Sequence, residues 1–397
     1  MARIRTLVLE ADGSSRKAIA ADTLFRGVLR LDRRVVPARW RAHPAVRKLL
    51  GPRYDSTGYI ADWRDAVLAE PALDVESVNI NNLVEYRRAR RKIREYPLVI
   101  ILHSAAGDSM ELLRHTADWF TGRRGALAVF IGNEYDLMVE KIGFCRDTSA
   151  DFICSQLPIA SARWLYADAT RSRVLAMPHG LNPDVYRPAP DVARTIDIGF
   201  IGDVYGHFIG DIERTNLIRH FQAHGAGLGL RCDIRSGRVP RHRWVEFLQR
   251  CRGIIGAESG TYYLDRSGAL IPEVLEWCRL HPAASFEEVH ARFFAGRAIE
   301  HSGKAISSRH FEPIGTKTCQ LLLDGDYNGI LEADEHYIAI RKDLSNLPEA
   351  LERFADEGYR AAMAERAYEH VLAGHTYVHR IRAFVQAVAG APRGAAA

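Results

Sequence analysis

The sequence predicts an α/β protein built from two doubly wound domains, each with a parallel sheet that helices cover on both faces. Short apolar runs rich in β-branched residues alternate with helical patterns along the chain. The apolar runs are unbroken, which is typical of parallel strands buried on both faces. With 397 residues the chain is too long for one ordinary core, and its 47% apolar and 26% charged residues are typical of a globular protein.

The first half of the chain contains a series of predicted strands, at 4–10, 75–80, 97–102, 127–132, 151–155 and 173–178. The helical patterns between them lie at 83–95, 109–121 and 157–167. The alternation stops at the proline-rich stretch 187–193, which we interpret as a linker. We therefore predict a first doubly wound domain over residues 1–190.

The alternation restarts after the linker, with strands at 196–202, 230–236, 253–259 and 319–325 and helices at 212–224, 243–251, 347–372 and 377–389. Residues 266–300 form an inserted helical segment to which the sequence assigns no role. We predict a second domain over 191–375, a helix at 376–389 that packs back across the domains, and a disordered Ala-Gly tail at 390–397. Domains of this kind bind ligands beyond the carboxyl ends of their strands, so the site is expected in the cleft between them.

Cysteine usage and hydropathy indicate a cytoplasmic protein. The six cysteines form no Cys-x-x-Cys pair, so we interpret them as reduced thiols. The opening stretch "MARIRTLVLEADG" ends in acids and is predicted to be a strand rather than a signal peptide. No apolar run approaches the ~20 residues that a membrane-spanning helix needs. Peripheral contact with the inner face of a membrane is the alternative localisation.

Positive charge is concentrated in two stretches, although the formal net charge is only +5. Residues 26–53 carry nine Lys and Arg residues against Asp32 alone, and "YRRARRKIREY" (86–96) lies on a predicted helix. Basic residues interleaved with Leu, Val and Trp suit an anionic membrane or a phosphorylated substrate. A solvated helix face is the other interpretation, and it is the preferred one for 86–96. We expect no nucleic-acid partner, because no nucleic-acid-binding module accompanies the charge.

A small-residue loop in the second half suits a pyrophosphate group. In "IGFIGDVYG" (198–206) a strand ends at Gly202 and Asp203, and the following helix carries Arg214. Glycine lets backbone N–H groups approach phosphates, and the helix N-terminus attracts them. A plain strand-to-helix turn is the alternative. The stretch is not a Gly-x-Gly-x-x-Gly fingerprint, so a nicotinamide enzyme is not expected.

Four further motifs carry a resemblance to a known family: "MPHGLNPDVYRP" (177–188), "RHFEPIGTK" (309–317), "EHYIAIRKDLSNLPEAL" (335–351) and "AGHTYVHRIRAFV" (373–385). Their order resembles that of nucleotide-sugar glycosyltransferases of the GT-B fold, which has two Rossmann-like domains. It is similar in particular to the CgeB-like branch and its relatives in surface-polysaccharide clusters. The resemblance covers about residues 97–388. It implies transfer of a sugar from a nucleoside-diphosphate donor in the second domain to an acceptor in the first.

The resemblance also implies donor-binding residues. Glu312 resembles the second of two glutamates, eight positions apart, and would receive the ribose hydroxyls; an ionised carboxylate suits this task. The first glutamate, which contacts the sugar and bears on the stereochemistry, would fall at Lys304, so the chain departs from the family pattern at this position. Arg309 and Lys317 are expected beside the pyrophosphate, with a surface ion pair as the alternative. Glu258 and Ser259 of "GAESGTYYLD" are expected near the donor sugar.

Polar clusters at two strand ends of the first half are the catalytic candidates. His103 follows one strand, and Glu134 and Asp136 follow the next. Transfer requires an acceptor hydroxyl to lose its proton or a positive sugar to be stabilised, and these side chains can do either. The alternative is that His103 and the polar residues at the end of the next strand have a purely structural role.

Neither a metal nor another cofactor is expected. Asp324 and Asp326 form an Asp-x-Asp pair that could hold a cation, but they lie late in the chain and a charged turn explains them. We therefore predict a metal-independent glycosyltransferase, which moves a hexosyl or related group from a nucleotide-sugar donor to an unknown acceptor. The acceptor is expected to be lipid-linked or phosphorylated. The alternatives are a sugar-nucleotide epimerase of the same fold and a non-catalytic sugar-nucleotide-binding protein.

Overall fold

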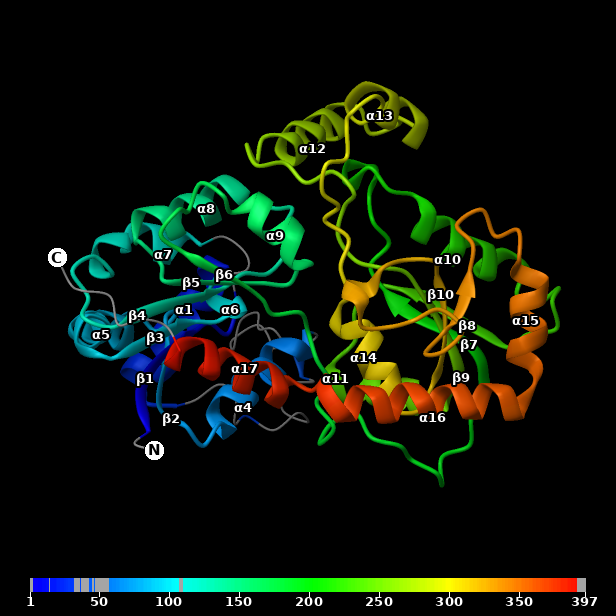
Figure 1. Ribbon diagram of the computed structural model, residues 1–397, viewed down its shortest axis with the longest axis horizontal. Helices are drawn as coiled ribbons and strands as arrows, with labels where there is room; N and C mark the ends of the chain where they lie inside the picture. The colour runs from blue at the N-terminus through cyan, green and yellow to red at the C-terminus, as the bar shows by residue number, and fades with distance from the viewer. Residues whose placement is uncertain are drawn as a thin grey trace. The chain divides into compact units, whose positions relative to one another are not determined.

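The computed structural model describes residues 3–13, 15–31, 36, 43, 44, 46, 57–106 and 110–390. The chain forms two compact units (Figure 1). Unit 1 comprises Met1–Ser155, Leu165–Ala176 and Ile381–Ala397, and unit 2 comprises Gln156–Trp164 and Met177–Arg380. The predicted domains are each continuous in sequence, whereas each unit combines separate stretches of chain.

Some sequence predictions fall outside the described residues. Most of the basic segment 26–53 does so, as do residues 391–397 of the predicted tail. All six cysteines are free thiols in the structure. Among the described residues, no helix is both long and apolar enough to cross a membrane.

Unit 1 contains a parallel sheet of six strands in the order β2-β1-β3-β4-β5-β6. The strands are β1 Ile4–Glu10, β2 Leu73–Asn79, β3 Leu98–Ile101, β4 Ala126–Phe130, β5 Phe152–Ser155 and β6 Arg173–Ala176. The helices are α1 Arg16–Asp22, η1 Thr23–Val28, α4 Gly58–Ala69, α5 Leu83–Glu95, α6 His103–Ala106, α7 Glu111–His115, η3 Ala117–Trp119 and α8 Met138–Asp147. Every residue of β3 is buried, as the unbroken apolar run predicts.

Unit 2 contains a parallel sheet of five strands in the order β11-β10-β9-β7-β8. The strands are β7 Ile196–Gly202, β8 Cys232–Ser236, β9 Cys251–Gly256, β10 Cys319–Leu323 and β11 Ile338–Ile340. The helices are η4 His207–Ile209, α10 Glu213–His224, α11 Arg241–Arg250, α12 Leu270–Leu280, α13 Phe286–Phe293, α14 Ser308–Gly315, η5 Tyr327–Gly329, α15 Leu347–Ala355 and α16 Glu357–Gly374. Two further helices, α9 Ile159–Leu165 and α17 Tyr377–Ala389, span the boundaries between the units.

The core of unit 2 lies on both faces of its sheet. Leu321 and Leu323 of β10 pack in one cluster with Phe221 and Phe354, whereas Leu322 packs in another. Successive side chains of a strand point to opposite faces, so a strand with a core on each side carries consecutive apolar residues, as Leu321–Leu323 do.

Each predicted strand is present, and β1 and β7 have the predicted bounds, but two predicted helices are wrong. The helix expected at 347–372 is two helices, α15 and α16. Between them Asp356 is extended (φ −67°, ψ 113°), and its side chain accepts a hydrogen bond from the backbone N–H of Tyr359. Asp thus ends one helix and caps the next. The helix expected at 109–121 is also interrupted, at Thr116, giving α7 and η3.

The inserted segment 266–300 is a helical hairpin with a small core of its own. Val274 of α12 and Val289 of α13 are fully buried in a cluster that also includes Phe294 and, from outside the hairpin, Phe208 of η4. Ser285 begins α13 with a capping box to Glu288. The hairpin therefore packs on the loop that follows β7.

Candidate functional site

The strand order of unit 2 places a topological switch point between β7 and β9. The connections from these two neighbouring strands leave in opposite directions, which opens a crevice at their carboxyl ends. The loops after β7 and β9 and the start of α14 lie at this edge. Most of the predicted donor-binding residues are on these segments.

Three side chains form a compact cluster between α11 and α14. The indole Nε1–H of Trp244 donates a 2.6 Å hydrogen bond to Oε2 of Glu312. The guanidinium of Arg309 stacks on the same indole, with Cζ 4.2 Å from the ring centroid. Trp244 and Glu312 are almost fully buried, at 4% and 5% exposure. The indole therefore fixes the positions of a carboxylate and a guanidinium together.

Both charged groups of this cluster retain unused hydrogen-bonding capacity. Nη1 of Arg309 is buried and has no hydrogen-bond partner within the described part of the chain. The hydrogen bond from Trp244 goes to Oε2 of Glu312. The other carboxylate oxygen, Oε1, accepts no hydrogen bond from any described residue. A buried donor without a partner is costly, so a ligand that accepts a hydrogen bond there would offset the cost. The cluster can thus receive an anion at Arg309 and a hydroxyl at Glu312.

Arg214, in the first turn of α10, lies over the end of β7. Its guanidinium stacks on Tyr205 at 4.6 Å and on Phe200 at 5.6 Å, and its buried Nε has no partner among the residues described. A Cβ at Gly202 would come within 3.4 Å of Nη2 of Arg214. Glycine therefore leaves room for Arg214 at the strand end.

Lys304 belongs to a charge network in which its own ion pair is buried. It pairs with Asp211, and the two residues are 5% and 6% exposed. Its Nζ also lies 4.6 Å from the ring centroid of Tyr262. The hydroxyl of Tyr262 donates to Glu213 at 2.6 Å, and Lys342 pairs with Glu213 at 3.5 Å. Positive and negative charges alternate through the network, which joins the loops after β7, β9 and β11.

Glu258 and Ser259 lie on the loop that leaves β9. Burial raises the pKa of Glu258, although the backbone N–H of Tyr327 donates to it at 2.9 Å and Lys304 is nearby. The backbone of Ser259 pairs with that of Ala305 through two 2.9 Å hydrogen bonds. This pairing holds the loop after β9 against the stretch that carries Lys304.

Two predicted donor residues have acidic partners. Asp203 pairs with Arg238, and both side chains are about half exposed. Lys317 pairs with Glu365 of α16 and lies over Tyr368. For Lys317 this geometry is that of the alternative interpretation, an ion pair, and the assignment of both residues to the donor stays a prediction.

Two of the motifs that carry the family resemblance meet in unit 2. The backbone N–H of Leu181 donates to His375 O and that of Tyr377 donates to Leu181 O, each at 3.0 Å. A Cβ at Gly180 would lie 2.8 Å from the backbone of Thr376 and Tyr377, so only glycine allows this approach. Arg380 donates to Pro178 O at 3.2 Å, and its burial lowers its pKa to about 10.

His310 is neutral and holds the start of α14. Its Nδ1 accepts a hydrogen bond from the backbone N–H of Ser307 at 2.9 Å, so the proton is on Nε2, which donates to Ala257 O at 3.1 Å. Burial lowers the pKa of His310 to about 4, which favours this neutral form. His310 therefore fixes α14, with Arg309 and Glu312, to the loop after β9.

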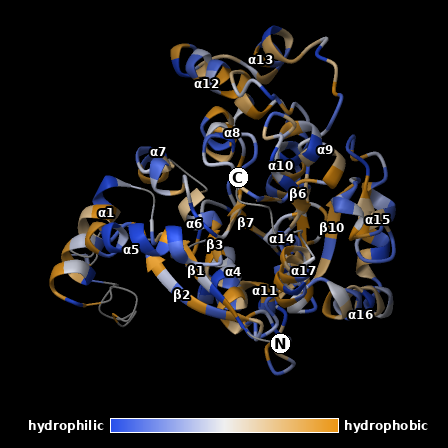
Figure 2. Ribbon diagram, turned by 60° about the vertical axis from the view of Figure 1, so that its left-hand side comes forward, coloured by the Kyte–Doolittle hydropathy of each residue, from blue (hydrophilic) through white to orange (hydrophobic). Residues whose placement is uncertain are grey.

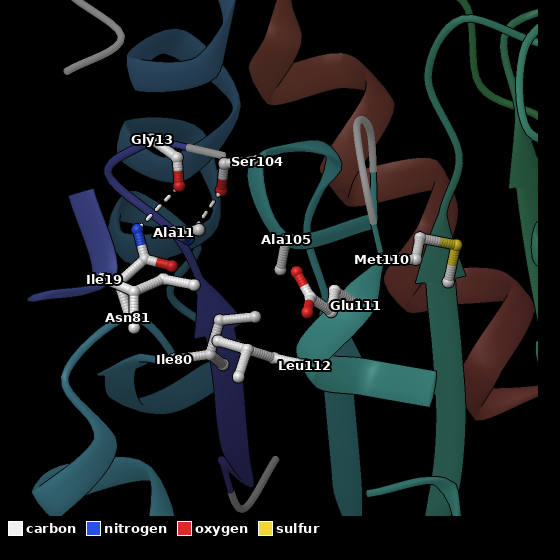
Figure 3. Close-up of a pocket in the computed structure, with 10 residues that line it drawn as sticks. All are labelled: Ala11, Gly13, Ile19, Ile80, Asn81, Ser104, Ala105, Met110, Glu111 and Leu112. Atoms are coloured by element: carbon white, nitrogen blue, oxygen red, sulfur yellow. Dashed lines mark hydrogen bonds between the residues drawn. The ribbon is translucent and has the colours of Figure 1, made fainter. Parts of the chain in front are cut away.

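Unit 1 has a corresponding switch point between β1 and β3 (Figure 3). The backbone N–H of Ala11 donates to Oγ of Ser104 at 3.0 Å, and Asn81 donates to Gly13 O at 2.6 Å. A cavity of about 20 Å³ lies there, beside Glu111. This is about the volume of one water molecule.

The catalytic candidates of unit 1 are buried. His103 is 3% exposed and lies among aromatic rings, 5.0 Å from Trp63 and 5.6 Å from Phe130 between centroids. Glu134 is 5% exposed, and its Oε1 accepts 2.7 Å hydrogen bonds from Ser155 and Tyr166. The structural alternative fits both environments, and the catalytic assignment stays a prediction.

The loop that carries Asp136 is held by a lysine that sequence analysis missed. Lys141 is fully buried, and its Nζ donates to the carbonyls of Gly132, Asn133 and Asp136 at 2.7–2.9 Å. Asp136 itself is half-buried. No sequence signal distinguishes Lys141 from an ordinary helix-surface lysine.

No arrangement suited to a metal is found within the described ranges, where no cluster of three or more His, Cys, Asp or Glu side chains could hold an ion. Asp324 and Asp326 are exposed on a turn after β10. Metal independence of the chemistry stays a prediction.

Comparison with known proteins identifies the class of this fold. The chain resembles an α-glucosyltransferase bound to UDP and a 13-mer DNA containing an HMU base, at 8% identity and a TM-score of 0.57. It also resembles Anabaena HepE bound to UDP and glucose, at 11% identity and a TM-score of 0.50. Both likenesses cover 98% of this chain and 100% of the other. The chain thus has the GT-B fold, as predicted.

Residues 207–386 match the family described as glycosyl transferase-like. This range includes Arg214, Lys304, Arg309, Glu312 and Arg380. No curated protein of known function matches the sequence of the chain. The GT-B fold and the family match over residues 207–386 together confirm the predicted resemblance to glycosyltransferases of this fold. The CgeB-like branch stays a prediction.

Proposed function

We propose that this protein transfers a sugar from a nucleoside-diphosphate sugar to an acceptor, and that the Trp244–Arg309–Glu312 cluster binds the nucleotide half of the donor. The observation that carries the proposal is the buried Nη1 of Arg309 without a partner, beside a carboxylate oxygen that accepts no hydrogen bond. Glu312 would accept hydrogen bonds from ribose hydroxyls. Arg309 and Arg214 would bind the pyrophosphate, as charge-assisted hydrogen bonds from guanidinium groups to phosphate are strong. UDP is the appropriate probe, since the related structures contain it.

Calorimetry with UDP tests this assignment. Glu312→Gln keeps the shape of the side chain but removes its charge, and should weaken UDP binding about tenfold or more, because a hydrogen bond to a charged group contributes ~1.5–3 kcal/mol. Arg309→Ala should weaken UDP binding but not uridine binding, since uridine lacks the phosphates.

Arg243→Ala is the matched control. Arg243 is next to Trp244 on α11, but its side chain is 66% exposed and pairs with Glu246. Its removal should leave UDP affinity unchanged. Wild-type affinity in both Glu312→Gln and Arg309→Ala would place the nucleotide elsewhere.

One observation favours a second candidate, a protein that binds sugar nucleotides without turnover. Lys304 stands where the resemblance implies a glutamate that contacts the sugar, and it is already paired with Asp211. Release of UDP from a UDP-sugar, with or without acceptor, would show that the protein is an enzyme and not only a binding protein. A product that forms with no acceptor and retains the nucleotide would instead indicate an epimerase.

The finer features of the reaction are also proposals. We propose a hexosyl or related group, a metal-independent reaction in which the arginines neutralise the diphosphate, and a lipid-linked or phosphorylated acceptor of a surface-polysaccharide pathway. Turnover that persists in EDTA would support the absence of a metal requirement. Turnover restored only by Mg²⁺ or Mn²⁺ would contradict it.

A further inference from the structure

The outward face of α5 carries a dense group of arginines, which we call the α5 arginine surface. The residues that line it are Arg87, Arg88, Arg90, Arg91, Arg94, Glu95, Gly122 and Arg124. They surround an open hollow of about 490 Å³. Figure 2 shows α5 as a predominantly blue helix.

Most of this positive charge is not neutralised by the described residues. Arg91 pairs with Glu95 at 2.7 Å, and Arg90 is 3.7 Å from Asp118. The remaining members form no ion pair within the described part of the chain: Arg87, Arg88, Arg94 and Arg124. The surface therefore attracts anions.

The stability of α5 does not require this charge. The helix is attached to unit 1 by its other face, where Tyr86, Ala89 and Ile93 are buried. Arg87 and Arg91, like Arg90 and Arg94, are four residues apart, and like charges at this spacing destabilise a helix. Clustered arginines that oppose folding are expected where an anionic partner offsets the repulsion.

The lining residues indicate a phosphate-rich partner. Guanidinium groups bind phosphate oxygens in a bidentate manner. Among the described residues, those that line the hollow include no aromatic or aliphatic side chain, so it offers charge and hydrogen-bond donors but no aromatic platform for a base. The lining thus favours a surface of phosphate groups over a nucleotide or a nucleic acid.

Exposed apolar side chains lie beside this charge. The π-helical turn η1 packs against α5, and Arg26 of η1 is 3.7 Å from Glu85 of α5. Four large apolar residues in and just after η1 are about half exposed or more: Leu24, Val28, Leu29 and Leu31. Cationic and apolar side chains together are typical of a surface that binds a membrane interface.

We propose that the α5 arginine surface and the apolar residues of η1 bind the phosphate headgroups of an anionic membrane. The surface lies in unit 1, apart from the residues assigned to the donor, so the inference does not depend on the proposed function. It revises the preferred sequence interpretation of residues 86–96 as a solvated helix face.

Cosedimentation of the full chain with vesicles tests the proposal. The protein should bind vesicles that contain phosphatidylglycerol and not vesicles of phosphatidylcholine alone, and salt should weaken binding because it screens exposed charges. Arg87→Glu/Arg88→Glu/Arg94→Glu should lower vesicle affinity about a hundredfold or more, since each basic residue near an anionic bilayer contributes roughly fivefold.

The matched control reverses three exposed arginines that lie elsewhere, Arg171→Glu/Arg219→Glu/Arg382→Glu, and should bind vesicles nearly as the wild type does. Circular dichroism of both triple variants checks that they fold. Equal loss of binding in both would mean that only net charge matters and would overturn the proposal. Wild-type binding to duplex DNA but not to anionic vesicles would also overturn it, in favour of a nucleic-acid partner.

Discussion

A single indole positions the two charged side chains on which the proposed donor site depends. Trp244 donates to Glu312 and supports Arg309, although the first pair is separated by 68 positions in sequence. Glu312 and Arg309 could be chosen from the sequence because a motif surrounds them. Trp244 could not, because its apolar spacing on α11 is that of any core residue.

Replacing this indole should reveal its role. Trp244→Phe keeps a ring under Arg309 but removes the N–H, so the buried carboxylate of Glu312 loses its donor. The free energy of unfolding should fall by about 1–3 kcal/mol, the cost of an unsatisfied buried group. Urea denaturation measures this. Trp277→Phe is the control, since Trp277 forms no hydrogen bond through Nε1 in the described structure, and an equal loss in both variants would contradict the argument.

Buried histidines should make unit 2 sensitive to acid. Burial lowers the pKa of His310 to about 4 and that of His179 to about 3, from 6.5. Below pH 6.5 the unfolded chain takes up protons that the folded chain does not, so stability is full above pH 6.5 and decreases as pH falls toward 4. Each histidine contributes a slope of about 1.4 kcal/mol per pH unit.

Urea denaturation of unit 2 as a function of pH tests this. His310→Asn should reduce the slope between pH 6.5 and 4 by about 1.4 kcal/mol per pH unit. Carboxylates also contribute to acid unfolding, but they are the same in the wild type and in His310→Asn. The difference between the two slopes therefore measures the contribution of His310. Identical slopes would mean that His310 takes up its proton as readily in the folded protein as in the unfolded chain, so its pKa is not lowered.

At the scale of elements, the sequence predicts the positions of strands well where the burial of apolar residues alone determines them. β1 and β7 are found with their predicted bounds because their apolar runs are buried on both faces. The break at Asp356 was not predicted, because the apolar pattern continues across it and only the capping hydrogen bond separates α15 from α16. The site is harder to predict than the strands, since loops after different strands bring together residues that are far apart in sequence, such as Lys304 and Asp211.

Lys304 stands where the family resemblance implies a glutamate. Its positive charge is neutralised by Asp211 on the loop after β7. Lys304→Met should leave the Asp211 carboxylate buried without a countercharge, and breaking a buried pair in this way costs about 3–5 kcal/mol. Adding Asp211→Asn should restore most of the loss, while keeping the acceptor for the backbone N–H of Glu213. Thermal unfolding of the two single variants and the double variant measures the coupling. Additive losses would show that the two charges do not stabilise each other.

At the scale of the whole molecule, the last helix joins the two units covalently. Tyr377–Arg380 of α17 belong to unit 2, and the chain from Ile381 onward belongs to unit 1. Phe384 is fully buried in unit 1, 5.3 Å from Phe130 between ring centroids. The core of unit 1 is therefore completed by a residue from the opposite end of the sequence.

Two matched core substitutions should separate the units by function. Phe384→Ala in unit 1 and Phe354→Ala in unit 2 each remove a buried ring, at a cost of about 3–5 kcal/mol. Phe354 packs so closely that a Cβ at Gly253 would lie 2.5 Å from its ring. Hydrogen exchange should show faster opening only in the unit that carries the change. As temperature rises, UDP binding should be lost first in Phe354→Ala and persist in Phe384→Ala, because the proposed nucleotide residues all lie in unit 2. Loss of UDP binding in Phe384→Ala at a temperature where unit 2 remains protected would mean that unit 1 contributes to nucleotide binding.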